Sequence, residues 1–425
     1  MRLSIEKIIY PGKSLGRHVG KVVLTDEGLP GETVETSIVS EKKNFIQAQT
    51  QEVLTASADR IAPRCAHYRI CGPYQYIQPA AHVAIKHAQV QEFFTHGLRL
   101  TNIDIISRPS PEMWQYRNKL QVHLLHHDGQ CVPAYHVPGT HDQFAPIERC
   151  ALAAAPLNAL VTQAAALLTA KQESSVLQLT ARHSRSQDKL LLGLQGENAA
   201  ASANVHAIAA ELARQFPISG IIYQSARTSR GTVLAGTNQL EEVVNGKCFG
   251  FGIDSFFQIN IPLLEQLARD LQATLGNNPG SLLDLYAGVG TFGILLAAVC
   301  RSVTAVEVSP EDMAFLQNNI QANHLSHINL RPGSAEHWAQ SLLKQAPDIA
   351  LVDPPRRGLD ERICGALNKY PPQRLVYISC DPATLLRDLK LLSEKFLIRQ
   401  VFWYDFFPQT PHIETMAILE RQATA

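Results

Sequence analysis

The stretch LLDLYAGVGTFG, residues 282–293, decides the fold of the carboxyl-terminal half of the chain. Gly288, Gly290 and Gly293 form a strict G-x-G-x-x-G between an apolar run typical of a strand and a segment typical of a helix. Such a turn lets the backbone pass close to a cofactor, and Glu307, which ends the next apolar run, can accept both hydroxyls of an adenosine ribose. The pattern predicts a nucleoside-cofactor site and leaves NAD and S-adenosylmethionine open.

Further apolar runs surround this motif. From about residue 250, SLLDLYA, SVTAVEVS, DIALVDPP and RLVYISC are each separated from the next by a helical or loop segment, which is typical of a doubly wound parallel sheet. The last two runs, IRQVFWYDFFP and PHIETMAILER, follow one another without a helix. They predict an antiparallel hairpin that closes the edge of the sheet.

The rest of the chain divides into two parts. Residues 1–58 show short alternating apolar segments between turn signals, which predicts a small OB-type β-barrel. Residues 59–245 carry cysteines, a helical stretch at AAHVAIKHAQVQEFF, strands at KLQVHLLHH and LLLGLQG, and an Ala-rich helix pattern from Leu152 to Lys171. The predicted fold class is therefore α/β, with a Rossmann-like domain over residues 246–425 that follows a barrel and a central α+β domain.

Composition and charge narrow the class of protein. The 425 residues are 45% hydrophobic and 18% charged, with no apolar run near the roughly 18 residues that span a bilayer and no apolar signal core at the start. We expect a soluble cytoplasmic protein without membrane contact. Because 38 basic residues balance 38 acidic ones, nucleic-acid binding must come from local basic patches. The candidate patches are Lys42-Lys43, Tyr116 to Lys119, and Arg182 to Arg185.

Three polar residues that follow the glycine motif later in the chain, Asp353, Cys380 and Glu414, have the chemistry of a catalytic site. Asp353 opens DPPRRG at the carboxyl end of a strand, and Cys380 ends the next strand before a helix whose amino end would lower the thiol pKa. Glu414 is a single carboxylate in an apolar hairpin strand, where a raised pKa would suit a proton acceptor. The structural alternatives are a rigid turn, a buried cysteine and a half-exposed glutamate. Arg356 replaces the aromatic residue that amino-methylating enzymes carry after a similar Pro-Pro, which argues against an exocyclic amine as target.

These motifs together resemble the RNA uracil-5-methyltransferase family, of the TrmA and RlmD type. LLDLYAGVGTFG, LVDPPRRGLD, ISCDPATLLRDL and FPQTPHIETMAIL follow the order of the family signatures, and DSFFQIN at 254–260 is similar to its glutamine motif. The amino-terminal IEKIIYPGKSLGR, VGKVV, LPGE and RIAPRC resemble the RNA-binding TRAM module that some members carry. The resemblance extends over nearly the whole chain.

The resemblance implies a reaction and a set of site residues. Cys380 would add to C6 of uracil, C5 would take the methyl group of S-adenosylmethionine, and Glu414 would remove the C5 proton. The cofactor would be held by Gln258, Tyr286, Glu307 and Asp353. The TRAM-like module favours large-subunit (23S) ribosomal RNA as the substrate, with transfer RNA as the alternative. The oligomeric state is open, and we expect a monomer.

Two other functional classes fit parts of the pattern. An NAD-dependent oxidoreductase would explain the glycine motif and Glu307, but it gives Cys380 and Glu414 no role. A non-catalytic RNA-binding protein of the same fold would agree with the altered cysteine pattern described next.

The cysteines before the catalytic domain depart from the family pattern. Members often hold a 4Fe-4S cluster with C-x5-C-G-x-C and a late fourth cysteine. The resemblance assigns Cys65, Cys71 and Cys150 to three of these positions, whereas Tyr74 stands at the other. A three-cysteine cluster, a different metal and no metal stay open. The remaining cysteines (Cys131, Cys248, Cys300, Cys364) are expected to be structural, and the histidines His123, His126 and His127 to be surface strand residues.

Overall fold

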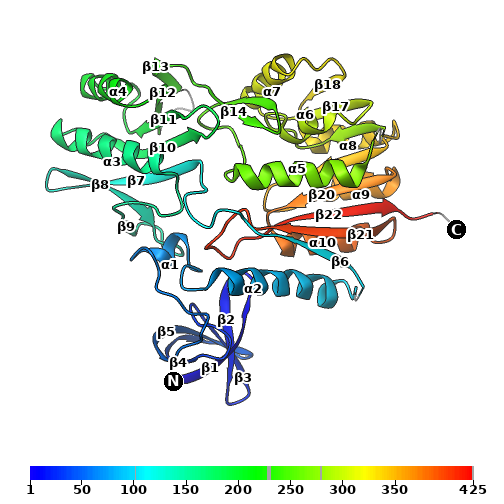
Figure 1. Cartoon of the computed structure of the whole chain (residues 1–425), viewed down its shortest axis with the longest axis horizontal. Helices are drawn as coiled ribbons and strands as arrows, with labels where there is room; N and C mark the ends of the chain where they lie inside the picture. The colour runs from blue at the N-terminus through cyan, green and yellow to red at the C-terminus, as the bar shows by residue number, and fades with distance from the viewer. Residues whose placement is uncertain (101, 227–230, 278–279, 424–425) are drawn as a thin grey trace.

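The computed structural model describes residues 1–100, 102–226, 231–277 and 280–423 (Figure 1). The amino-terminal strands form a closed barrel in the order β1-β2-β3-β5-β4. Its alternating apolar residues, among them Leu3, Val23 and Val34, fill the interior, so the predicted barrel is present. The strands are β1 (Arg2–Ile9), β2 (Lys13–His18), β3 (Lys21–Thr25), β4 (Thr33–Glu41) and β5 (Phe45–Thr55).

A helical connection joins the barrel to the rest of the molecule. It contains α1 (Tyr68–Cys71), α2 (Pro79–Glu92) and the π-helix η1 (Phe93–Gly97). In Figure 1, α2 lies between the barrel and the larger body above it. Its residue Val90 is buried in the hydrophobic core of the carboxyl-terminal domain, together with Phe94 of η1. This helix therefore belongs structurally with the catalytic half of the chain.

The central domain is a seven-stranded sheet in the order β13-β12-β11-β10-β7-β8-β9. Leu157 and Leu160 of α3 and Ile208 of α4 pack into the same core as its strands. The strands and helices are β7 (Lys119–His127), β8 (Gln130–His136), β9 (Phe144–Pro146), α3 (Ala155–Ala170), β10 (Val176–Ser184), β11 (Lys189–Gly196), α4 (Ala203–Gln215), β12 (Ile218–Ser225) and β13 (Gly231–Gly236). The strands expected at KLQVHLLHH and LLLGLQG and the Ala-rich helix are all present.

The carboxyl-terminal domain is an eight-stranded sheet in the order β18-β17-β16-β19-β20-β22-β21-β6. Strands β16 to β20 pair in parallel, as the sequence predicts. One face is covered by α5, α6 and α7, and the other by α2, α8, α9 and α10. The elements are α5 (Ile261–Leu275), β16 (Ser281–Asp284), α6 (Thr291–Ala297), β17 (Ser302–Glu307), α7 (Pro310–Ala322), β18 (Ile328–Pro332), α8 (Ala335–Leu343), β19 (Ile349–Val352), α9 (Glu361–Lys369), β20 (Arg374–Ser379), α10 (Pro382–Leu392), β21 (Phe396–Tyr404) and β22 (Glu414–Arg421).

The predicted hairpin of β21 and β22 is present, but it does not end the sheet. Strand β6 (Asp104–Arg108), from the other half of the chain, pairs in parallel with β21 and forms the edge. An exposed hairpin strand would leave its backbone N–H and C=O groups unpaired, and β6 supplies their partners. A second hairpin, β14 (Leu240–Val244) with β15 (Lys247–Phe251), packs on the core of this domain and spans the boundary expected near residue 246. Among the described residues, no helix is long and apolar enough to cross a membrane.

Candidate active site

The glycine turn lies between β16 and α6. Gly288 and Gly290 have φ values of +55° and +94°, which favour glycine. A Cβ on Gly290 would lie 2.3 Å from Leu316, whereas a Cβ on Gly288 would meet only open space. Glu307 accepts hydrogen bonds from the backbone N–H of Gly288 (2.8 Å) and of Ser309 (2.6 Å). The carboxylate at the end of β17 thus holds the turn beside an open surface.

Two carboxyl groups meet where the strand order reverses between β16 and β19. Such switch points are the usual ligand crevices of open α/β sheets. Burial raises the pKa of Asp284 to about 7, and burial together with the charge of Asp284 raises the pKa of Asp353 to about 7. The Asp284 Oδ2 atom is buried and has no hydrogen-bond partner among the described residues. The crevice therefore contains one buried acceptor oxygen without a partner among the described residues.

These residues fit the predicted cofactor. The open space over Gly288 leaves room for a nucleoside, and the orphaned Asp284 oxygen offers an acceptor at the same sheet edge. Gln258 is 5% exposed, and it follows Phe257, which packs in one core with Ala287 of the glycine turn. Tyr286 is partly buried directly after β16. Glu307 and Asp353 follow or end strands at the same edge of the sheet as the glycine turn, and the assignment of Gln258, Tyr286, Glu307 and Asp353 to the cofactor stays a prediction.

Cys380 follows β20 and precedes α10. Asp381 caps that helix, since its carboxylate accepts hydrogen bonds from the N–H groups of Ala383 (2.9 Å) and Thr384 (3.0 Å). Burial raises the pKa of the Cys380 thiol to about 12, with further increases from the carboxylates of Glu414 and Asp353. The expectation that the helix end lowers this pKa is wrong for the free protein, because burial of the thiol and the carboxylates of Glu414 and Asp353 raise it.

Glu414 begins β22 and is 2% exposed. Its Oε1 atom has no hydrogen-bond partner within the described part of the chain. Burial and the charge of Asp353 raise its pKa well above the usual value, whereas Arg356 opposes this shift. Cys380, Glu414, Asp353 and Arg356 therefore lie near enough to influence one another electrostatically. Arg356 is exposed and forms no ion pair with another described residue.

A buried ion pair fixes the loop that leads to Glu414. Lys86 of α2 is fully buried, and its Nζ donates to Asp405 Oδ1 (2.6 Å) and to the carbonyl oxygens of Phe407 (3.2 Å) and His412 (2.7 Å). His412 lies within this loop, and its pKa is lowered to about 4 by burial and by the charge of Arg356. A helix from the other half of the chain thus positions the catalytic hairpin.

The sequence did not identify three side chains near this pocket. Phe256 in DSFFQIN is 66% exposed beside the cofactor residues, which is unusual for a large aromatic side chain. His412 lies in the loop before β22, and Tyr10 comes from the β1–β2 turn of the barrel, far away in sequence. Of these three, only Phe256 could have been found from a local pattern. Two adjacent phenylalanines precede Gln258, and on an extended segment only one of the two rings, that of Phe257, is buried.

The basic patches differ in their exposure. Lys42 and Lys43 are exposed at the β4–β5 turn. Arg182 is 3% exposed and donates to the backbone oxygens of Ile253 and Ser255, so the prediction that it contacts RNA is wrong. Its position on β10, inside the sheet, explains the error. Arg185 is paired with Glu112 at 2.7 Å.

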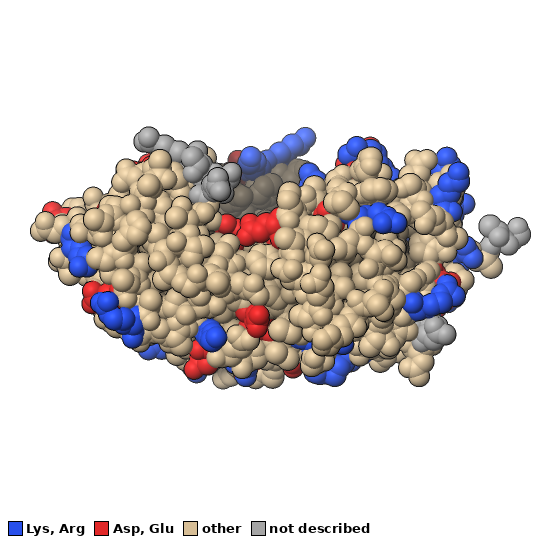
Figure 2. All heavy atoms as spheres, turned by 90° about the horizontal axis from the view of Figure 1, so that it is seen from above, with Lys and Arg blue, Asp and Glu red and all other residues tan. Residues whose placement is uncertain are grey.

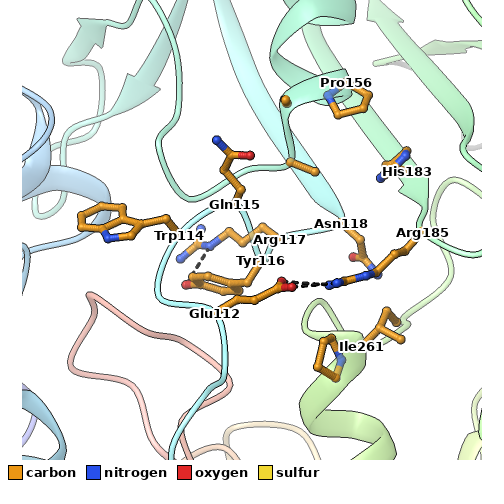
Figure 3. A pocket seen from close by; sticks show the side chains of 13 residues that line it. Glu112, Trp114, Gln115, Tyr116, Arg117, Asn118, Pro156, His183, Arg185 and Ile261 are labelled. Atoms are coloured by element: carbon orange, nitrogen blue, oxygen red, sulfur yellow. Dashed lines mark hydrogen bonds and ion pairs between the residues drawn. The ribbon is translucent and has the colours of Figure 1, made fainter. Parts of the chain in front are cut away.

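A pocket of about 400 Å³ separates the central domain from α5 (Figure 3). Figure 3 shows the Glu112–Arg185 ion pair on one side and Arg117 donating to the Tyr116 hydroxyl on another. The Tyr116 hydroxyl in turn donates to the carbonyl oxygen of Pro408 (3.0 Å), in the loop before Glu414. Seen from above, the molecule is hollowed between the central and carboxyl-terminal domains, with acidic side chains at the edge of the hollow (Figure 2). The segment Tyr116 to Lys119 therefore lies mostly inside the molecule.

The three cysteines predicted as metal ligands lie together, whereas Tyr74, at the remaining position of the family pattern, makes contacts elsewhere. The Cys71 thiol shares hydrogen bonds with Cys65 and Cys150, which lower the pKa of these two partners. Tyr74 is 1% exposed, and its hydroxyl accepts from Gln89 of α2 instead (3.3 Å). Gln75 contacts the Cys65 sulfur through its side-chain nitrogen (3.1 Å). An amide thus occupies one side of the thiol group.

A four-cysteine cluster does not fit this arrangement. Within the described ranges, no group of three or more His, Cys, Asp or Glu side chains is arranged to hold a metal ion. The described residues therefore give no support to a 4Fe-4S cluster. Cys131, Cys300 and Cys364 are buried, as expected of structural cysteines, while Cys248 is half-buried. On β7, His123 and His126 are half-buried and His127 is exposed.

Comparisons with known proteins agree with this site. A family model described as tRNA (uracil-5-)-methyltransferase matches residues 79–422. An uncharacterised RNA methyltransferase of Bacillus cereus is 28% identical over 441 residues, covering 98% of this chain and 95% of the relative. Another, of Staphylococcus aureus, is 28% identical over 426 residues and covers 93% and 92%.

A solved structure shares the fold over the full length. Pyrococcus abyssi tRNA (uracil-54, C5)-methyltransferase, in complex with S-adenosyl-L-homocysteine, superposes with a TM-score of 0.77 at 21% identity. The match covers 99% of this chain and 100% of the other. Since the family model matches more than half of the chain, the protein belongs to the tRNA (uracil-5-)-methyltransferase family and is an S-adenosylmethionine-dependent RNA methyltransferase.

Proposed function

We propose that the protein methylates C5 of a uridine in RNA through a covalent adduct with Cys380, with Glu414 as general base. The observation that carries this proposal is the grouping of a thiol, a buried carboxyl group whose Oε1 atom has no partner among the described residues, and an exposed arginine. The match of a methyltransferase family model to residues 79–422 argues against the NAD-dependent oxidoreductase alternative.

The chemistry assigns a role to each group. Uracil C5 is too weak a nucleophile to attack a methyl sulfonium, so the Cys380 sulfur first forms a bond to C6, and the electron pair of the C5–C6 bond moves to C5 and O4. The enolate carbon C5 then takes the methyl group. Glu414 removes the proton from C5, and the returning electron pair expels the Cys380 thiolate and frees 5-methyluracil. Arg356, whose charge acts on both Cys380 and Glu414, would stabilise the enolate charge.

S-adenosylmethionine supplies the electrophilic methyl group when it is bound. In the proposed site Glu307 receives the ribose hydroxyls, the turn at Gly288 leaves room for the nucleoside, and Gln258, Tyr286 and Asp353 complete the contacts. Similarity to the fold of the Pyrococcus abyssi enzyme with its bound S-adenosyl-L-homocysteine supports this assignment. Deprotonation of Cys380 requires that the negative charge of the pocket be compensated, since the neighbouring carboxylates raise its pKa.

The proposed target is large-subunit ribosomal RNA, because an RNA-binding barrel precedes the catalytic domain. Transfer RNA is the second candidate, since the Pyrococcus abyssi tRNA enzyme matches 99% of this chain and therefore shares the barrel. In either RNA the uridine must leave its stack to reach Cys380, which costs a few kcal/mol unless it already lies in a loop.

The test uses labelled S-adenosylmethionine with unmodified ribosomal RNA and transfer RNA in separate reactions. Mass spectrometry of the digested nucleosides should find 5-methyluridine from wild type and none from Cys380→Ser. Cys248→Ser is the matched control, because Cys248 is also half-buried but lies outside the pocket. Methylation of transfer RNA alone would reject the ribosomal target. No 5-methyluridine on either RNA would reject the catalytic proposal.

A further inference from the structure

The β1–β2 turn of the barrel lies against the catalytic loop. A Cβ added to Gly12 would lie 2.8 Å from the Cβ of Pro411, two residues before Ile413 and three before Glu414. Gly12 has a φ of +90°, so the turn is built for close approach at this point. The same turn borders, with Thr410, Pro411 and His412, a groove of about 700 Å³ that extends to the central domain. The barrel therefore reaches the catalytic centre itself.

Tyr10 is the side chain that this turn carries toward the centre. Its ring packs edge-on against Phe93 with centroids 5.6 Å apart, and it joins the core that contains Leu385 of α10. With Leu386 of the same helix it borders a cavity of about 370 Å³. Because α10 begins two residues after Cys380, these contacts place the ring at the helix that follows the nucleophile.

The charges that act on Tyr10 are those of the reaction centre. Burial raises the pKa of its hydroxyl, and after burial the largest influences come from Asp381, Arg356, Cys380 and Glu414. The Tyr10 hydroxyl donates no hydrogen bond to any residue that the structure describes. The Tyr10 ring is partly exposed, and its hydroxyl has no hydrogen-bond partner among the described residues. The ring is therefore free to contact a ligand that binds near these four groups.

We propose that Tyr10 of the barrel forms one wall of the pocket for the extruded uracil and positions the base beside Cys380. A flat aromatic ring is the usual support for an unstacked base, whatever its sequence. Tyr10 is a positioning residue in this account, and the inference rests on the proposed function. It also explains why the barrel is locked to the catalytic loop instead of being joined through a flexible linker.

The experiment compares Tyr10→Ala, Tyr10→Leu and Tyr10→Phe with wild type in the full-length protein. Tyr370→Ala is the matched control, since Tyr370 is also a half-buried tyrosine that packs on the same core. Each variant is assayed for kcat at saturating RNA, for KM and for RNA affinity. Tyr10→Ala and Tyr10→Leu should lower kcat at least about tenfold with RNA affinity within about threefold of wild type, and Tyr10→Phe should restore kcat.

Tyr10→Leu keeps a branched apolar side chain in the core and removes only the aromatic ring, so it remains informative if Tyr10→Ala fails to fold. A kcat of Tyr10→Leu within about twofold of wild type would overturn the inference while the methylation activity stands. A loss confined to RNA affinity would also overturn it and make Tyr10 an ordinary RNA contact of the barrel. A wild-type protein that forms no 5-methyluridine would overturn the proposed function and this inference together.

Discussion

At the scale of single residues, the pocket combines a thiol and carboxyl groups that suppress one another's ionisation. Burial and the carboxylates of Glu414 and Asp353 hold the pKa of Cys380 near 12. The thiol is therefore protonated at neutral pH in the free protein, and the reactive thiolate is a minor species. Arg356 is the nearby positive charge that lowers this pKa.

We therefore expect the rate of methylation to rise with pH. Since the folded pKa of Cys380 lies above the usual value, the thiolate fraction increases about tenfold per pH unit below that pKa. The single-turnover rate should increase steadily from about pH 6 to 9 with S-adenosylmethionine and RNA bound, and Arg356→Gln should lower it at every pH. A rate independent of pH in this range would show that deprotonation of the thiol does not limit the reaction.

At the scale of elements, the position of the catalytic loop depends on α2. Lys86 and Asp405 are both fully buried, and breaking such a pair leaves an uncompensated charge. Lys86→Met should lower the free energy of unfolding by about 3–5 kcal/mol, measured by denaturant titration, and should reduce methylation because the loop before Glu414 loses its anchor. Lys390→Met, on the exposed face of α10, is the control and should change stability by less than about 0.5 kcal/mol.

The same pair predicts a pH effect on stability. Burial opposes ionisation of Asp405, but the charges of Lys86 and His82 outweigh it and lower its pKa to about 2. Because the folded pKa lies below the unfolded value, the stabilisation is complete above about pH 4 and is lost as the pH falls toward 2. The difference in stability between wild type and Asp405→Asn should shrink over this interval.

The sequence predicted the elements that carry local patterns. The glycine turn, the parallel strands, the hairpin of β21 and β22 and the barrel all follow from periodicity and turn residues within short windows. Strand β6 was missed as the sheet edge because its partner lies almost 300 positions later, and no local pattern reports such pairing.

Local patterns also determine where the residues of the predicted site lie in the sheet. Cys380 and Glu414 lie at strand ends, but the raised pKa of Cys380 comes first from burial and then from the carboxylates of Glu414 and Asp353, which only the folded chain brings near the thiol. The sequence did not reveal that Arg182 is buried. Its guanidinium group donates to backbone carbonyl groups about seventy positions later, and no local pattern reports such contacts. Tyr10 could not be linked to the centre, since the barrel and the catalytic loop meet only in the folded chain.

At the scale of the whole molecule, the neutral net charge leaves RNA affinity to local surfaces. Lys42 and Lys43 are exposed at one end of the barrel. The double variant Lys42→Ala/Lys43→Ala should bind RNA several-fold more weakly than wild type. The slope of log affinity against log salt concentration should become shallower by about one to two, and kcat at saturating RNA should stay unchanged. Lys344→Ala, an exposed lysine after α8, is the control. An unchanged salt slope would exclude this turn from the RNA interface.

The measurement that most directly tests the account is the covalent bond between Cys380 and uridine. RNA in which 5-fluorouridine replaces uridine should trap the adduct, since the C5 position then has no proton for Glu414 to remove. With S-adenosylmethionine present, intact-mass spectrometry should detect a protein–RNA complex for wild type and Cys248→Ser, and none for Cys380→Ser. An adduct that forms equally well with Cys380→Ser, or 5-methyluridine formed by Cys380→Ser on ordinary RNA, would contradict the account.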